Sequence, residues 1–396
     1  MKTILLKRGK EASIERFHPW IFSGAIARIE EGTKEGDVVE VLAADGTPLA
    51  TGHYERGSIA VRILAFGRTA IDEAFWTDRI RAAFRLRQAL GLVAAADNDT
   101  FRLVHGEGDS LPGLIVDVYG HTAVVQAHSI GIHEAREAIA RAVCAATDGL
   151  VESVYYKSET TLPGHTREET ENGFIVGEAQ SNVGVERGLQ FHIDWLHGQK
   201  TGFFIDQREN RHLVEQYARG RRVLNMFCYT GGFSVYAMRG GAACVHSVDS
   251  SAKAMDLTAA NIALNFPDDS RHEGFTDDAF HFLQHIPTDA ATAYDLIVLD
   301  PPAFAKHKDA VRNALKGYTR LNAAALRRIA PGGVLFTFSC SQAVSKEQFR
   351  LAVFTAAAQS GRSVRILHQL HQPADHPINI YHPEGEYLKG LVLYVE

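Results

Sequence analysis

The stretch that decides the fold is Val223-Leu224-Asn225-Met226-Phe227-Cys228-Tyr229-Thr230-Gly231-Gly232-Phe233. Its first half is an apolar run of the length of a buried strand, and the paired glycines after it let the backbone approach a ligand closely. Comparable apolar runs recur at 245–249, 296–300 and 334–338, and alanine-rich stretches with helical periodicity separate them. This alternation predicts a parallel sheet covered by helices on both faces.

Two further strands are predicted at the end of the chain, near 363–369 and 387–395. A short proline-rich segment separates them, so we expect an antiparallel pair that closes the sheet. Residues 191–396 are therefore predicted to form an α/β, Rossmann-like domain with a mixed seven-stranded sheet.

The first half of the chain has different patterns. Residues 1–72 alternate apolar and polar residues between turn signals, which predicts a small β-barrel or sandwich. Residues 73–190 mix helical and strand periodicities, which predicts a central α+β domain. A length of 396 residues agrees with two to three domains.

Composition excludes several classes of protein. With 45% hydrophobic and 22% charged residues the chain is an ordinary globular protein, and no apolar run approaches the roughly 20 residues of a membrane span. The apolar start is too short for a signal peptide, and the four cysteines have no CxxC spacing, so we expect a cytoplasmic protein without a metal site. A net charge of -6 argues against strong non-specific binding of polyanions.

Ligands of such a sheet bind at the carboxyl ends of its strands. The second strand ends in Asp249, a carboxylate that can accept hydrogen bonds from ribose hydroxyls. Asp278 is expected at the end of the third strand, where it can accept from an adenine amine, although either acid can simply cap a helix. Because no GxGxxG fingerprint or P-loop is present, a nucleoside without phosphates fits best, and S-adenosylmethionine is the common one.

The fourth strand ends in Asp300-Pro301-Pro302-Ala303-Phe304. Two prolines remove two backbone donors, which leaves carbonyls free to accept from an exocyclic amine, and Phe304 can stack on a base. The plain alternative is a strand terminator.

Cys340 lies at the carboxyl end of the fifth strand. A thiolate that attacks carbon 6 of a pyrimidine makes carbon 5 nucleophilic enough to accept a methyl group. Asp300 is the candidate donor to ring nitrogen 3, which requires a protonated carboxyl. Cys228 is the competing thiol, but it lies in the cofactor loop and is interpreted as structural; the residues do not identify the base that removes the carbon 5 proton.

Several motifs resemble one known family. The run 198–211, GQKTGFFIDQRENR, is similar to the entry motif of the RlmI-like large-subunit ribosomal RNA cytosine-5 methyltransferases. The stretches 225–233, 300–304 and 339–341 resemble the later motifs of this family, as do its tail segments at 375–377, 383–385 and 387–390. Residues 18–25 and 106–113 resemble its first and middle domains, so the resemblance covers essentially the whole chain.

The resemblance implies a PUA RNA-binding domain at 1–72, a strand-strand-helix-strand-strand domain at 73–190 and a class I methyltransferase domain at 191–396. It implies S-adenosylmethionine as cofactor, 5-methylcytidine in 23S ribosomal RNA as product and attack by Cys340. It also suggests a homodimer. Position 303 departs from the family, since it is Ala where Lys is common, and Cys228 stands where a smaller or hydroxyl residue is usual.

The expected site residues fall into three groups. Cys340 and Asp300 are the catalytic candidates. The cofactor-binding candidates are Gln207, Arg208, Asn225, Phe227, Tyr229, Thr230, Gly231, Asp249, Asp278 and Asp300. The substrate-binding candidates are Pro301, Pro302, Phe304 and Lys200.

Two other functions stay open at this point. A guanine or adenine amino methyltransferase would use the Asp-Pro-Pro motif without a covalent adduct. A non-catalytic RNA-binding assembly factor would keep the methyltransferase fold without its activity.

Overall fold

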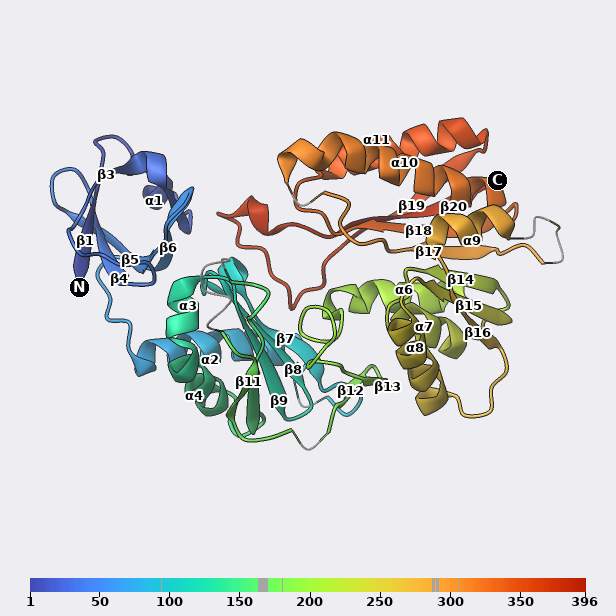
Figure 1. Ribbon diagram of the computed structural model, residues 1–396, viewed down its shortest axis with the longest axis horizontal. Coiled ribbons are helices and arrows are strands. Elements are labelled where there is room, and N and C mark those ends of the chain that lie inside the picture. Colours follow the sequence, from blue (N-terminus) through green and yellow to red (C-terminus); the bar gives the residue numbers. More distant parts are fainter. Residues whose placement is uncertain (94, 163–169, 180, 287–288, 290–291, 306) are drawn as a thin grey trace. The chain divides into compact units, whose positions relative to one another are not determined.

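The computed structural model describes residues 1–396 except 94, 163–169, 180, 287–288, 290–291 and 306 (Figure 1). The chain forms two compact units. The first comprises residues 1–188, 193–205 and 374–385, and the second comprises residues 189–192, 206–373 and 386–396. The three domain ranges expected from the sequence remain a prediction.

The N-terminal part of the first unit is a curled six-stranded sheet with its own small apolar core. Its elements are β1 (Lys2–Leu6), α1 (Ala12–Glu15), β2 (Trp20–Phe22), β3 (Ile26–Ile29), β4 (Val38–Leu42), β5 (Pro48–Tyr54) and β6 (Ile59–Phe66). The strand order is β2-β6-β5-β4-β1-β3. Only β1 and β4 pair in parallel, so the sheet is the small β domain that the period-two pattern predicts.

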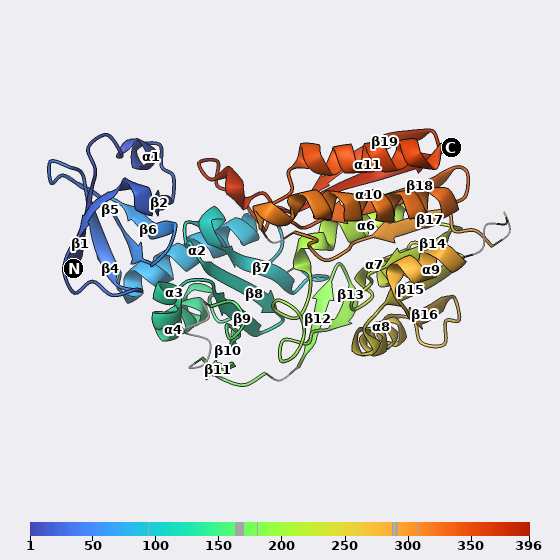
Figure 2. The ribbon, with the colours of Figure 1, turned by 45° about the horizontal axis from the view of Figure 1, so that its top comes forward.

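The rest of the first unit is built on a five-stranded sheet of order β11-β10-β9-β8-β7. Its elements are α2 (Glu73–Ala89), β7 (Thr100–His105), β8 (Leu114–Tyr119), β9 (Thr122–Ala127), α3 (Ile130–Glu134), α4 (Arg136–Ala146), β10 (Ser153–Tyr156), β11 (Gly173–Val176) and β12 (Val183–Glu186). Helices α2 and α4 lie against this sheet (Figure 2) and share one apolar core with it. Three strands precede the helical segment, one more than the strand-strand-helix-strand-strand order has.

The second unit carries the mixed seven-stranded sheet, whose order is β16-β15-β14-β17-β18-β20-β19. The strands are β14 (Arg222–Met226), β15 (Cys244–Asp249), β16 (His272–Thr276), β17 (Leu296–Leu299), β18 (Gly333–Ser339), β19 (Val364–His371) and β20 (Lys389–Val395). The short strand β13 (Leu189–His192) begins this unit. The first five strands are parallel, whereas β20 runs antiparallel to both neighbours, which confirms the predicted closing pair.

Helices cover both faces of this sheet (Figure 1). On one face lie α6 (Arg208–Tyr217), α7 (Gly232–Arg239) and α8 (Ala252–Asn265), and on the other lie α9 (Ala279–His285), α10 (Val311–Arg328) and α11 (Lys346–Ser360). The second set encloses a single apolar core with the strands. Among the described residues no helix has the length and apolar character that crossing a bilayer requires.

Candidate active site

The loop between β14 and α7 is the most unusual backbone of the second unit. Phe227, Tyr229 and Gly231 have φ angles of 58°, 49° and 76°, so three alternate residues are left-handed. A non-glycine residue in this region costs roughly 1–3 kcal/mol, and such strain gathers at ligand-binding sites. A Cβ on Gly231 would lie 2.6 Å from Cγ2 of Thr258, so the loop also has no room for a larger residue.

Asp249, at the end of β15, holds this loop. Its carboxylate accepts hydrogen bonds from the backbone N–H of Tyr229 at 3.0 Å and of Ser251 at 2.9 Å, one on each oxygen. A carboxylate has about four acceptor sites, so capacity remains for the two hydroxyls of a ribose. The geometry therefore fits the nucleoside part of S-adenosylmethionine.

Asn225 lies beneath the loop and is fully buried. Its amide donates to Ser234 Oγ at 2.9 Å, and the chain of polar contacts continues through Ser247 to His272. Burial lowers the pKa of His272 to about 4, so this imidazole is neutral at pH 7. Within the described part of the chain Oδ1 of Asn225 is buried without a partner, which fits a donor that a ligand would supply.

Asp278 and Cys228 have structural contacts. Asp278 caps α9, since its Oδ1 accepts from the backbone N–H of Phe280 and His281 at 2.9 and 3.0 Å. Cys228 is buried, with Sγ 3.5 Å from the sulfur of Met255, and burial raises its pKa to about 12. Its buried, protonated thiol agrees with the structural role expected from the sequence.

Asp300 follows β17 and contacts one of the predicted cofactor residues directly. The side-chain amide of the buried Gln207 donates to Oδ2 of Asp300 at 3.0 Å, and Asn210 holds the other end of that amide at 2.6 Å. The residues that follow Asp300 in the Asp-Pro-Pro motif are only partly exposed to solvent. Pro301 is buried and Pro302 is exposed, while the ring of Phe304 packs against Tyr318 at 4.7 Å between centroids.

Cys340 directly follows β18 and is half-buried. The residues on either side of it are fixed. Ser339 Oγ donates to the hydroxyl of Tyr318 at 2.9 Å, and Ser341 Oγ donates to the carbonyl of Ala305 at 2.5 Å. The backbone that carries the thiol is therefore tied to α10 and to the loop after the Asp-Pro-Pro motif.

Lys389 is a functional candidate that the sequence analysis missed. It lies opposite Ser339 in the β18–β20 pair, is 5% exposed, and donates from Nζ to the carbonyls of Ser341 at 2.5 Å and Val344 at 2.7 Å. Burial lowers its pKa to about 8, and attraction to Cys340 partly opposes this shift. The available signal was a lysine in an otherwise apolar strand, since such a charge is rarely buried without partners.

The remaining predicted residues have these positions. Arg208 is buried at the start of α6, with Nε 3.4 Å from a carboxylate oxygen of Glu209. Thr230 is buried, and its carbonyl accepts from Asn261 at 2.9 Å. Lys200 belongs to the first unit, where its Nζ lies 4.4 Å from the centroid of the Phe204 ring. Of the predicted residues, Gln207 and Asp300 are in direct contact, as are Tyr229 and Asp249.

The strand order, the left-handed loop after β14 and the carboxylate after β15 together define a class I methyltransferase fold. A family model described as S-adenosylmethionine-dependent methyltransferase matches residues 102–389, and a PUA-like domain model matches residues 4–66. The chain belongs to this family of S-adenosylmethionine-dependent methyltransferases and uses that cofactor.

Relatives that match the whole chain support this membership of the methyltransferase family. The chain is 38% identical over 403 residues to ribosomal RNA large subunit methyltransferase I of Klebsiella pneumoniae (strain 342), and 39% identical over 396 residues to the protein of that name from Aeromonas hydrophila. Each alignment covers 99% of this chain and 98% of the relative.

Among solved structures, an assigned S-adenosylmethionine-dependent methyltransferase from Streptococcus mutans superposes with a TM-score of 0.84 at 20% identity. The structure of SMU.776, complexed with SAH, has the same TM-score at 21% identity. Both alignments cover 100% of each chain, so the fold is shared from end to end.

Proposed function

We propose that this chain methylates carbon 5 of a cytosine in 23S ribosomal RNA through a covalent adduct with Cys340. The names of the whole-chain relatives support ribosomal RNA as the substrate. The observation that carries the choice of base is the half-buried thiol at the carboxyl end of β18, the strand that pairs with β17 and its Asp300.

The reaction follows from the chemistry of a pyrimidine. The thiolate of Cys340 adds to carbon 6, and the electron pair of the 5,6 double bond moves toward carbon 5 and the N3–O2 side of the ring. S-adenosylmethionine supplies an electrophilic methyl group, which carbon 5 accepts. Transfer of the carbon 5 proton to a general base, and from it to solvent, then re-forms the double bond and expels the thiolate. The enzyme is regenerated, and S-adenosylhomocysteine is the other product.

Asp300 and Lys389 support this step from two sides. Asp300 is assigned to hydrogen-bond ring nitrogen 3 as the negative charge develops there, and the amide of Gln207 fixes the orientation of its carboxyl group. Lys389 holds the carbonyl of Ser341, the residue directly after the nucleophile, and its ammonium attracts the Cys340 thiolate. A thiolate is the reactive form, so a nearby cation favours attack.

The other site residues keep the roles expected of them. Asp249 is assigned to the ribose hydroxyls and Asp278 to the adenine amine, while Phe227, Tyr229, Thr230 and Gly231 form the loop around the methionine part. Gln207, Arg208 and Asn225 complete the cofactor site. The exposed Pro302, the half-buried Phe304 and Lys200 are assigned to the RNA, whereas Pro301, also expected there, is buried and is not assigned a contact. We propose a cytoplasmic enzyme, because its substrate is assembled there, and a homodimer stays a prediction.

The experiment that tests the covalent route uses RNA transcripts in which cytosine is replaced by 5-fluorocytosine. Fluorine at carbon 5 cannot leave as a proton does, so the adduct is trapped and the protein gains the mass of RNA on a denaturing gel. We expect this complex with the wild-type chain and none with Cys340→Ala. If methyl transfer to ordinary RNA proceeds while no complex forms, the amino methyltransferase alternative replaces this one. A chain that binds RNA but neither the cofactor nor a methyl group would be an assembly factor.

A further inference from the structure

The helices on one face of the methyltransferase sheet carry a one-sided distribution of charge. Helix α10 has five basic residues (Arg312, Lys316, Arg320, Arg327 and Arg328) and no acidic one. Helix α11 adds Lys346 and Arg350 against the single acid Glu347, and α9 has no acid at all. On the opposite face, α6, α7 and α8 carry nearly equal numbers of basic and acidic residues. The whole chain has a net charge of -6.

The exposed cations of α10 have no carboxylate partner among the residues that the structure describes. Arg312, Lys316, Arg320 and Arg327 are exposed and stand at helical spacing on one face. Within the described residues none of them forms an ion pair with a carboxylate. Arg320 instead lies over the ring of Phe280 at 4.3 Å, and Arg327 donates to the carbonyl of Gln359 at 3.1 Å.

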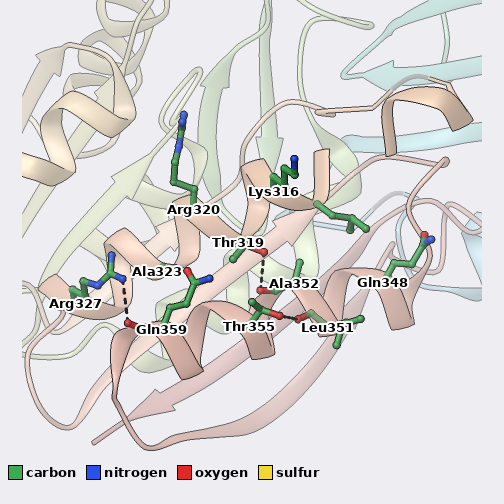
Figure 3. Close-up of a pocket in the computed structure, with 11 residues that line it drawn as sticks. Lys316, Thr319, Arg320, Ala323, Arg327, Gln348, Leu351, Ala352, Thr355 and Gln359 are labelled. Carbon is green, nitrogen blue, oxygen red and sulfur yellow. Dashed lines mark hydrogen bonds between the residues drawn. The ribbon is translucent and has the colours of Figure 1, made fainter. Parts of the chain in front are cut away.

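Three of these four side chains, those of Lys316, Arg320 and Arg327, border a groove between α10 and α11 (Figure 3). Lys316, Arg320 and Arg327 line it from α10, and the polar side chains of Gln348 and Gln359 line it from α11. Leu351 on its rim is 61% exposed, and Phe354, one helical turn further on, is 66% exposed. Cations beside amides are a combination that can bind the phosphates of single-stranded nucleic acid.

The position of the groove suits RNA that leaves the active site. Helix α10 begins shortly after the Asp-Pro-Pro loop, so Arg312 is at the end nearest the carboxyl edge of the sheet. From Arg312 to Arg327 the helix rises about 22 Å, a span of several nucleotides. An acidic protein would also be attracted by the charge, but the proposed ribosomal RNA substrate favours a phosphodiester backbone.

We propose that the α10–α11 groove, with the basic stripe Arg312, Lys316, Arg320 and Arg327, binds the RNA strand that flanks the target nucleotide. This inference rests on the proposed RNA substrate and not on which base is methylated. The contacts are to phosphates, so they provide affinity and register without reading sequence.

The test is the salt dependence of RNA binding. Anisotropy titrations with a labelled single-stranded RNA of mixed sequence, from about 50 to about 200 mM salt, give the slope of log K against log salt. Each lost phosphate contact reduces the magnitude of that slope by about 0.7 on single strands. The triple variant K316Q/R320Q/R327Q is therefore expected to reduce the magnitude by about 2. The single substitution Lys316→Gln should reduce the magnitude of the slope by about 0.7. The substitution Arg219→Gln, at an exposed residue on the other face, should leave the slope unchanged.

An unchanged slope in the triple variant overturns the proposal. Weaker binding of polyglutamate together with unchanged binding of RNA would also overturn it, in favour of an acidic protein partner. Lys316→Gln removes no intramolecular contact among the described residues, so it tests the stripe even if the triple variant folds poorly. Calorimetry with S-adenosylmethionine checks the fold, and the adduct with 5-fluorocytosine RNA tests the proposed function independently.

Discussion

The ammonium of Lys389 donates to the carbonyl of Ser341, the residue that directly follows Cys340. A strand that is otherwise buried and apolar thus brings one charge to the end of β18. This contact holds the backbone on one side of Cys340, while the hydroxyl of Tyr318 accepts a hydrogen bond from Ser339 on its other side. Both contacts lie within the second unit.

Removal of the nucleophile should separate binding from chemistry. Cys340→Ala is expected to lower methyl transfer at least about 1,000-fold, because the covalent route is lost, and to leave the affinity for S-adenosylmethionine near normal. Radiolabelled methyl transfer and calorimetry measure the two quantities. Cys244→Ala, a half-buried thiol at the start of β15, is the matched control and should keep its activity. Full activity of Cys340→Ala would move the nucleophile elsewhere.

Loss of the positive charge on Lys389 should lower the reaction rate at alkaline pH. Its pKa is lowered to about 8, so the ammonium is present below this pH and is lost as the pH rises through it. We expect kcat to fall above about pH 8 in the wild-type chain. Lys389→Arg keeps the charge throughout, so its profile should stay level there, even if its activity is lower. The same falling limb in wild type and variant would mean that another group titrates.

The cofactor loop should not tolerate a side chain at Gly231. Gly231 and Gly220 both have φ angles above 70°, so alanine at either costs about 1–2 kcal/mol of backbone strain. Only at Gly231 would the Cβ also clash, since Gly220 has open space around it. Gly231→Ala is therefore expected to weaken S-adenosylmethionine binding strongly, and Gly220→Ala to lower only the melting temperature. Equal cofactor affinities in the two variants would contradict this account of the loop.

His53 should make the first unit sensitive to acid. It is buried in β5, and burial lowers its pKa to about 4, below the unfolded value near 6.5. As the pH falls from 6.5 toward 4 the unfolded chain gains a proton that the folded one does not, so stability is lost in that window. Between pH 7 and pH 5 the loss from this group is about 2 kcal/mol.

Urea unfolding of wild type and His53→Leu at both pH values measures this term. Within the described part of the chain the Nδ1 atom of His53 has no hydrogen-bond partner, so leucine removes a titration without removing a bond. The variant should lose less stability than wild type on acidification. Equal losses would assign the acid sensitivity to other titratable groups.

The centre of the sheet could be predicted from the sequence because its inner strands are buried on both faces and so are continuous apolar runs, as 223–226 and 296–299 show. The carboxyl ends of these strands then follow, and with them Asp249, Asp300 and Cys340. The lysine in the apolar strand 389–395 was a local signal for Lys389, but its role could not be predicted, since its partners are carbonyls 45 and 48 residues away. Local patterns also could not reveal the left-handed Phe227 and Tyr229, whose strain tertiary contacts impose.

Segment 374–385 shows that local patterns also could not predict the boundaries of the two units. It lies between β19 and β20 in the chain, yet it belongs to the first unit, where Arg87 donates to the carbonyl of Asp375 at 2.7 Å. Local sequence patterns do not indicate that a segment between two strands of one unit belongs to the other unit. The partners are 288 residues apart, and only the folded chain brings them together.

The base that receives the methyl group is identified most directly by nucleoside analysis. Unmodified 23S ribosomal RNA is incubated with the chain and S-adenosylmethionine labelled in its methyl group, digested to nucleosides and separated. Transfer through Cys340 predicts that the label is found in 5-methylcytidine and nowhere else. Label in guanosine or adenosine would contradict the covalent mechanism and the choice of base.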